Sequence, residues 1–240
     1  MTGSGASWVA RGKDAARAGV RGVLHPVVSL LARLGVSPDH VTWTGLLVTM
    51  AGGVLFGAGR FVAGSLVALV GCLLDSVDGS LARMRGGETR WGAFLDSTTD
   101  RIADAALFLG VAAYYARQPL ELLTDEDQLM VLQMEYPPPV AEAIRMAAFD
   151  DWLTALAAIA ALVGAFLVSY TRARAEGLGL ECRVGWFERP ERLVVLLGAG
   201  LFGAASPVMP WALVVLAVLS FFTAFQRVAH VRKQLSTPAV

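Results

Sequence analysis

The chain has 240 residues, of which 55% are hydrophobic, and a mean hydropathy of +0.57. Twenty Lys and Arg balance twenty Asp and Glu, so the formal net charge is zero. This composition is too apolar for an average soluble domain and predicts one polytopic membrane domain. Two cysteines in unlike settings and three scattered histidines exclude a disulfide framework and a zinc or histidine-built metal site. The polar, glycine-rich N-terminus has no early apolar core, so we expect no cleaved signal peptide.

Residues 1–36 are predicted to form a cytoplasmic juxtamembrane segment with one amphipathic helix. Its mixture of basic and apolar side chains is typical of an interfacial helix lying on an anionic leaflet. An ordinary amphipathic helix packed on the domain is an equal alternative, and both descriptions can hold together. The basic side chains are Arg11, Lys13, Arg17 and Arg21.

Residues 37–230 are predicted to form the membrane domain, which opens with a turn and N-cap signal at 37–39. We predict an all-α integral membrane fold with six transmembrane helices and the N-terminal interfacial amphipathic helix. An acidic, proline-containing segment at 117–151 is predicted to be an extracytoplasmic loop, and 231–240 a cytoplasmic tail. The predicted spans are about 41–59, 61–74, 91–115, 152–170, 193–205 and 208–225.

Charge is distributed unevenly over these segments. Of the 20 Lys and Arg, only Arg60, Arg117 and Arg145 fall in segments assigned outside, which hold eight acidic residues. The positive-inside rule therefore predicts that both termini and the loops at 82–91 and 171–192 are cytoplasmic. The expected location is the cell (inner) membrane, with the active site on the cytoplasmic face.

Four carboxylates lie at this membrane boundary, where ionisable groups are costly and usually mark a site. Asp75 and Asp78 are three residues apart and Asp96 and Asp100 four apart, so two helices can present all four to one point. Such like charges need divalent cations, and oxygen-only ligands favour two Mg2+ or Mn2+ ions that clamp a phosphate ester. The structural alternative is a salt-bridge network with Arg83, Arg85, Arg90 and Arg101.

Two glycines and an arginine accompany the carboxylates. Gly79 and Gly92 fit helix packing, and at a phosphate site they also allow close approach of the backbone. Arg83 follows Asp78 by five residues, within reach of a phosphate as a bidentate donor.

These residues resemble the signature of the CDP-alcohol phosphatidyltransferases, matching it at Asp75, Asp78, Gly79, Ala82, Arg83, Gly92, Asp96 and Asp100. The resemblance implies a six-span fold in which the four aspartates hold two divalent cations and Asp100 is also the general base. It further implies that CDP-diacylglycerol binds with its cytidine diphosphate against the Gly79 backbone and Arg83. The remaining residues implied in nucleotide binding are Thr89, Ser37, Pro38, Asp39 and His40.

The acceptor is indicated by residues 169–193, SYTRARAEGLGLECRVGWFERPERL, and by GxTRxGAxLDxxxDRIxD from Gly87 to Asp104. Both stretches are similar to bacterial phosphatidylinositol phosphate synthases, in which a basic cluster receives the phosphate of inositol phosphate. The matching positions are Arg172, Arg192 and Arg227. Apart from the resemblance, three arginines at the cytoplasmic level of the membrane favour an anionic acceptor on physical grounds. For any one of these arginines, the alternative is binding of a lipid head group or snorkelling of the side chain to the interface.

The expected reaction is transfer of a phosphatidyl group from CDP-diacylglycerol to inositol phosphate, giving phosphatidylinositol phosphate and CMP. Glycerol 3-phosphate as acceptor is the nearest alternative. An ion- or proton-coupled transporter and a purely structural membrane protein are alternatives from other classes. The expected partners are these substrates, the bilayer and a second copy of the chain, which the small-residue faces and the resemblance indicate; no nucleic acid is expected.

Overall fold

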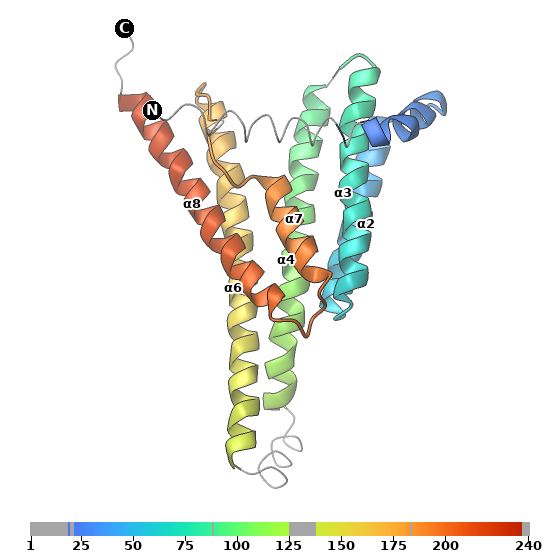
Figure 1. The fold of residues 1–240 in the computed structure, drawn as a ribbon. Helices are drawn as coiled ribbons and strands as arrows, with labels where there is room; N and C mark the ends of the chain where they lie inside the picture. The colour runs from blue at the N-terminus through green and yellow to red at the C-terminus, as the bar shows by residue number, and fades with distance from the viewer. Residues whose placement is uncertain (1–18, 20–21, 88, 125–137, 183, 237–240) are drawn as a thin grey trace. The chain divides into compact units, whose positions relative to one another are not determined.

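The computed structural model describes residues 19, 22–87, 89–124, 138–182 and 184–236, and every regular element within them is an α-helix (Figure 1). This confirms the all-α part of the prediction. A short apolar helix, Gly22–Arg33, precedes the longer ones. The longer helices are α2 (Pro38–Gly57), α3 (Phe61–Met84), α4 (Arg90–Thr124), α6 (Pro138–Gly177), α7 (Arg189–Gly200) and α8 (Val208–Ser236).

The chain forms two compact units. The first contains Met1–Val48 and Val70–Asp100, and the second contains Thr49–Leu69 and Arg101–Val240. The first unit is built around the buried side chains of Val28, Val41, Val77 and Leu81.

The short helix Gly22–Arg33 packs into the core of the first unit through one face. Val28 is only 2% exposed, whereas Val23 is 79% and Leu30 57% exposed. Val28 lies in one cluster with Val41, Val77 and Leu81, so this stretch contacts the first unit, while the prediction for residues 1–36 as a whole stays a prediction. The exposed apolar side of the short helix fits an interfacial position as well, which stays a prediction. Arg11, Lys13, Arg17 and Arg21 lie outside the described residues.

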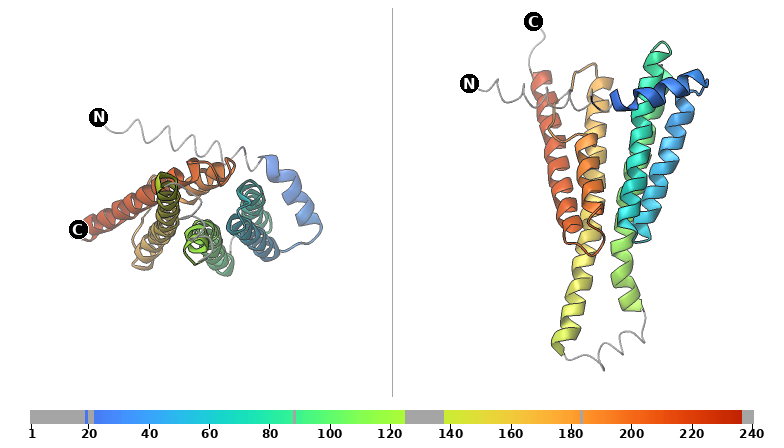
Figure 2. Two further views of the ribbon diagram at one scale, coloured as in Figure 1. Left: turned by 90° about the horizontal axis from the view of Figure 1, so that it is seen from below. Right: turned by 45° about the vertical axis from the view of Figure 1, so that its right-hand side comes forward.

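Small residues allow close helix packing in the second unit. Helices α6 and α8 lie side by side, and α7 packs against α8 (Figure 2). A Cβ atom on Gly164 of α6 would lie 2.8 Å from the Cβ of Ser220 in α8. At the crossing of α2 and α4, a Cβ on Gly110 would collide with the carbonyl oxygen of Gly53. Backbone contact of this kind is the usual means by which helices associate within a bilayer.

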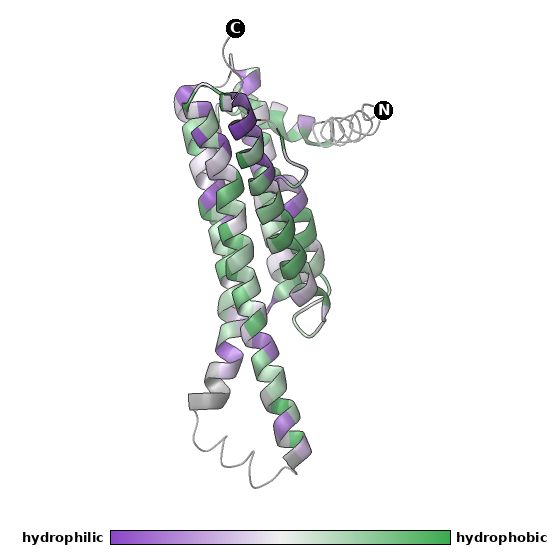
Figure 3. Cartoon of the chain, turned by 90° about the vertical axis from the view of Figure 1, so that its left-hand side faces the viewer, coloured by the Kyte–Doolittle hydropathy of each residue, from purple (hydrophilic) through white to green (hydrophobic). Residues whose placement is uncertain are grey.

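Helices α2, α3 and α8 and the stretch Glu142–Gly177 of α6 are long and apolar enough to cross a membrane. In Figure 3 the long helices are hydrophobic through their middle parts, with hydrophilic residues concentrated toward their ends. Helix α7 has only 12 residues, or about 18 Å at ~1.5 Å per residue, which is shorter than a hydrocarbon core of ~30 Å. The apolar part of α4 is bounded by charged residues at both ends. The structure therefore supports a multi-pass membrane protein, with four of the six predicted spans identified.

Two predicted boundaries differ from the structure. The segment 117–151 is helical at 117–124, where α4 ends, and again from Pro138, where α6 begins. Proline is compatible with a first helical turn because the N–H that it lacks has no partner there. The predicted fifth span extends to residue 205, whereas α7 ends at Gly200 and 201–207 form turns. The extracytoplasmic location of the 117–151 segment stays a prediction.

Candidate functional site

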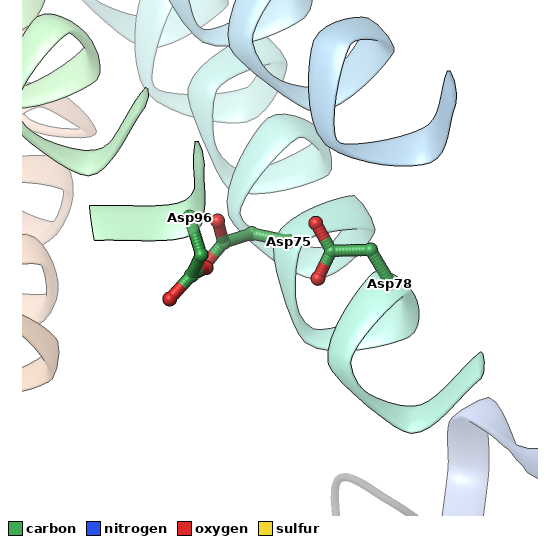
Figure 4. A group of neighbouring side chains, drawn as sticks. All are labelled: Asp75, Asp78 and Asp96. Atoms are coloured by element: carbon green, nitrogen blue, oxygen red, sulfur yellow. The ribbon is translucent and has the colours of Figure 1, made fainter. Parts of the chain in front are cut away.

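Three carboxylates converge in the first unit. Asp75 and Asp78 lie one turn apart on α3, and Asp96 lies near the start of α4. Each offers an oxygen within 4.8 Å of the oxygens offered by the other two, and Figure 4 shows the three side chains directed to one region. Asp78 is buried, Asp75 half-buried and Asp96 exposed, so the group is open to solvent on one side. The predicted convergence of carboxylates from two helices is confirmed for these three.

A hydroxyl group from α2 contacts the buried member of this group. Thr42 is 8% exposed, and its Oγ1 donates a hydrogen bond to Oδ2 of Asp78. Gly45, one turn later, allows α2 to approach α3, because a Cβ there would lie 3.2 Å from the carbonyl oxygen of Gly71. The close packing of α2 on α3 therefore places Thr42 where it fixes one carboxylate orientation.

Asp100 lies one turn beyond Asp96 on α4 and is half-buried. It is not among the three residues whose oxygens fall within the 4.8 Å limit. Its predicted roles as metal ligand and general base stay predictions.

The donor set of the carboxylate group fits a hard divalent cation. All three ligands are carboxylate oxygens, which Mg2+ and Mn2+ prefer, and neither histidine nor cysteine takes part. Three negative charges within 4.8 Å repel one another, and a cation among them relieves that repulsion. Asp75, Asp78 and Asp96 would hold the metal.

The predicted nucleotide-binding residues on α3 lie next to one another. A Cβ on Gly79 would lie 3.6 Å from Nη1 of Arg83, so the guanidinium lies alongside the glycine. Nη2 of Arg83 also donates to Ser80 Oγ at 3.3 Å. The backbone at Gly79 and the arginine are therefore placed where one phosphate-bearing ligand could contact both.

Ser37, Pro38, Asp39, His40 and Thr89 lie at helix starts. Ser37 Oγ accepts a hydrogen bond from the backbone N–H of His40 at 3.3 Å, with Pro38 as the first residue of α2. This confirms the predicted cap. Asp39 Oδ2 accepts from Trp91 Nε1 at 3.2 Å. Thr89 Oγ1 accepts from the N–H of Gly92 at 2.9 Å and caps α4.

Two of the three predicted acceptor-binding arginines are buried in the second unit. Arg192 and Arg227 are each 2% exposed, whereas the Arg172 side chain is 46% exposed and pairs with Glu176 at 2.8 Å. Arg172 and Arg192 both lie within electrostatic range of Arg227. The structure therefore gathers three cations from α6, α7 and α8 into one region.

Arg227 bonds extensively to the protein itself. Its Nε donates to the carbonyl oxygen of Val184 at 2.8 Å, and its Nη1 donates to the carbonyl oxygen of Val168 at 2.5 Å. Nη2 lies 3.4 Å from Oε1 of Glu188. These contacts tie α8 to the end of α6 and to the loop before α7.

Arg192 pairs with a carboxylate that the sequence analysis did not single out. Its Nη2 lies 3.1 Å from Oδ2 of Asp104, and Nε of Arg189 lies 3.3 Å from Oδ1 of the same residue. Asp104 is 2% exposed. The start of α7 is fixed by a capping box between Glu188 and Glu191, which sets the register of both arginines.

Thr42, Asp104 and Arg189 are the contacts that sequence reasoning missed. Asp104 closes the motif beginning at Gly87, and Arg189 belongs to the Glu-Arg-Pro-Glu-Arg run, so both lay within stretches already recognised as informative. Thr42 follows the predicted cap closely, and nothing in its sequence position indicates a contact 36 residues away.

Comparison with known proteins agrees with these observations. A phosphatidylinositol phosphate synthase of Streptomyces avermitilis is 37% identical over 229 residues, which cover 91% of this chain and 82% of the relative. The crystal structure of Mycobacterium tuberculosis phosphatidylinositol phosphate synthase with CDP-DAG bound is similar with a TM-score of 0.67 and 32% identity, covering 90% of this chain and 98% of that one. The same enzyme in complex with manganese and citrate gives a TM-score of 0.68 at 31% identity, covering 90% and 92%.

The sequence profile of the CDP-alcohol phosphatidyltransferases matches residues 35–222, which include both the carboxylate group and the buried arginine of α7. With this match over most of its length, the chain belongs to the CDP-alcohol phosphatidyltransferase family.

Proposed function

We propose that this protein transfers the phosphatidyl group of CDP-diacylglycerol to a hydroxyl of inositol phosphate, releasing CMP. The observation that carries the proposal is the convergence of Asp75, Asp78 and Asp96 within the residues matched by the family profile. The similarity to phosphatidylinositol phosphate synthases over about nine-tenths of the chain supports the choice of donor and acceptor.

Four aspartates are assigned to the metals and the proton. Asp75, Asp78, Asp96 and Asp100 would hold two divalent cations, Mg2+ or Mn2+, which when bound neutralise charge on the phosphates. Manganese in the similar M. tuberculosis structure supports this assignment. Asp100 takes the proton from the attacking hydroxyl of the acceptor. The hydroxyl oxygen forms a bond to the phosphorus that carries diacylglycerol, and the bond from that phosphorus to CMP breaks.

The donor nucleotide is assigned to residues of the first unit. Gly79 lets the cytidine diphosphate approach the α3 backbone, and Arg83 provides charged hydrogen bonds to it. Thr89 and the turn formed by Ser37, Pro38, Asp39 and His40 contribute polar groups at two helix starts. The CDP-DAG complex of the similar enzyme supports a nucleotide-linked lipid as donor.

The acceptor phosphate is assigned to Arg172, Arg192 and Arg227. Arg192 and Arg227 are almost wholly buried and each meets one carboxylate of the protein, but Nε and Nη1 of Arg192 have no hydrogen-bond partner among the described residues. Buried donors of this kind are costly unless a ligand supplies acceptor oxygens. A phosphorylated acceptor therefore fits this region better than a neutral alcohol does.

The proposed architecture places this chemistry at a membrane surface. Residues 37–230 form six spans, with the active site and both termini on the cytoplasmic side of the cell membrane, as the charge distribution favours. Residues 1–36 contribute the juxtamembrane helix, 117–151 face the opposite side, and 231–240 are a tail. A homodimer is supported by the small-residue helix faces.

CMP release by the purified full-length protein tests the function. The assay contains CDP-diacylglycerol, Mn2+ or Mg2+, and inositol phosphate, glycerol 3-phosphate or free inositol in parallel. We expect release with inositol phosphate and the loss of that release in Asp100→Asn. Preference for glycerol 3-phosphate would change the acceptor to that of phosphatidylglycerophosphate synthesis. Ion flux in vesicles without CMP release would point to a transporter, and full activity of Asp100→Asn would overturn the mechanism.

A further inference from the structure

We propose that Asp104 is a positioning residue for the acceptor phosphate, because it holds the Arg192 guanidinium in a fixed orientation inside the second unit. This inference rests on the proposed function, because it explains how the protein would select an acceptor that carries a phosphate.

The geometry consists of one carboxylate held between two arginines of the same helix. Oδ2 of Asp104 meets Nη2 of Arg192 at 3.1 Å, and Oδ1 meets Nε of Arg189 at 3.3 Å. Arg189 and Arg192 are three residues apart on α7 and therefore share a face. Both oxygens of Asp104 are thus engaged, so its role is to orient arginines rather than to take up a proton.

Two buried nitrogen atoms of Arg192 indicate that this side chain binds a ligand. Its side chain is 2% exposed, and its Nε and Nη1 atoms are buried without a hydrogen-bond partner in the described part of the chain. Buried donors left without acceptors are costly, and a phosphate group provides several charged acceptor oxygens. The single contact through Nη2 leaves the other nitrogens of the same rigid, planar group available.

The negative charge of Asp104 is shared between Arg189 and Arg192, so neither arginine is fully neutralised by it. An anion bound at Arg192 therefore still gains from that positive charge. Replacing Asp104 by asparagine preserves the volume but places an amide N–H2 against one of the guanidinium groups. One of the two contacts is then lost, and the contact that remains is to a neutral oxygen, so Arg192 is held less firmly whichever way the amide faces.

Steady-state kinetics of the full-length protein provide the first test. At saturating CDP-diacylglycerol and Mn2+, Asp104→Asn should raise the KM for inositol phosphate by roughly 10- to 100-fold, the range expected for loss of a charged hydrogen bond. The KM for CDP-diacylglycerol and the Mn2+ affinity should not change. Asp150→Asn, an exposed carboxylate on α6, is the matched control and should behave as wild type. An unchanged KM for inositol phosphate in Asp104→Asn overturns the inference.

A double variant separates positioning from a merely structural effect. If Asp104 acts through Arg192, then Asp104→Asn combined with Arg192→Gln should raise the KM no further than Arg192→Gln alone. Additive increases contradict that coupling. If Asp104→Asn fails to fold, Asp104→Glu serves in its place: an increased KM with an unchanged unfolding midpoint supports the inference, and a wild-type KM overturns it.

Binding of inorganic phosphate separates this inference from the proposed function. Phosphate should raise the unfolding midpoint of the wild type and should do so much less in Asp104→Asn. If the wild type releases no CMP with inositol phosphate yet shows this Asp104-dependent stabilisation, the proposed function fails and the anion site stands. If phosphate stabilises both proteins equally, the inference fails regardless of the activity.

Discussion

The carboxylate group of the first unit and the arginine group of the second are built in opposite ways. Asp75, Asp78 and Asp96 bring three like charges within 4.8 Å, and Asp96 is exposed. Arg192 and Arg227 are buried and each meets a carboxylate of the protein. The first group is therefore suited to a cation that comes from solution and leaves again, whereas the second carries its own counter-charges and is part of the packed interior. Substitutions in the two regions should consequently differ in whether stability falls together with function.

The largest effect is expected from Asp96→Asn. Removing one of three clustered ligands should lower CMP release by about 10³-fold or more, within the range by which positioned charged groups accelerate such reactions. Stability should stay the same or rise, because one like charge is removed. Mn2+ titration by electron paramagnetic resonance, CMP assays and thermal unfolding measure these effects, with Asp150→Asn as control. Unchanged Mn2+ affinity would exclude Asp96 as a ligand.

A smaller effect is expected from Thr42→Val, which keeps the shape of the side chain but removes the hydroxyl that donates to Asp78. Loss of a hydrogen bond to a residue that itself binds the metal typically lowers metal affinity or activity by about 10- to 100-fold. The Mn2+ concentration for half-saturation should rise, and Thr42→Ser should restore it. Thr44→Val is the control, because the Thr44 hydroxyl donates to the backbone oxygen of His40 and not to a carboxylate. Equal Mn2+ binding by Thr42→Val and the wild type would contradict the assignment.

In the arginine group, Arg227→Lys should reduce stability and acceptor affinity together. Lysine keeps the charge, but its three donors radiate from one nitrogen and do not reproduce the planar fork whose separate nitrogens reach Val184, Val168 and Glu188. We expect an unfolding midpoint several degrees lower and a KM for inositol phosphate raised by about tenfold. Arg232→Lys, exposed on the same helix, is the control. A raised KM with an unchanged midpoint would show that Arg227 serves the ligand alone.

The smallest functional effect is expected from Gly110→Ala, which lies in neither group. The added Cβ would collide with Gly53 at the crossing of α2 and α4 and should cost about 1–3 kcal/mol. Gly198→Ala on α7 is the control, since nothing lies within 4 Å of a Cβ there. Thermal inactivation in detergent measures the difference. Equal half-lives of the two variants would show that the crossing tolerates a side chain.

The sequence predicted those features that depend on spacing along one helix. Asp75 and Asp78 share a face because they are three residues apart, and the capping residues at Ser37 act on neighbours within one turn. Contacts between distant segments were not predictable in this way. Thr42 with Asp78 and Asp104 with Arg192 depend on which faces α2, α4 and α7 present to their neighbours, and a single sequence does not determine that.

Helix ends in the 117–151 segment were missed for a different reason. Its acidic residues and consecutive prolines are typical of a loop, but Pro138 occupies the first turn of α6, where proline is tolerated. Pro119 lies within α4 close to its end. The predicted loop was therefore too long. Its composition does not show where each proline lies relative to a helix terminus, and that position decides whether the proline is compatible with a helix.

The pairing of Asp104 with two arginines has a consequence for how the chain enters the bilayer. Under the proposed six-span topology, α7 is a 12-residue helix with Arg189 and Arg192 in its first turn. An arginine costs about 2.5–3.5 kcal/mol at the centre of an inserting helix and less near its end, and a helix this short has few apolar residues to offset two of them. Helix α7 would therefore partition poorly from water into lipid by itself. Helix α4 precedes it in the chain and supplies the carboxylate that offsets this cost. Insertion of α7 should consequently depend on α4 already being in the membrane, so the order of synthesis and the order of assembly coincide.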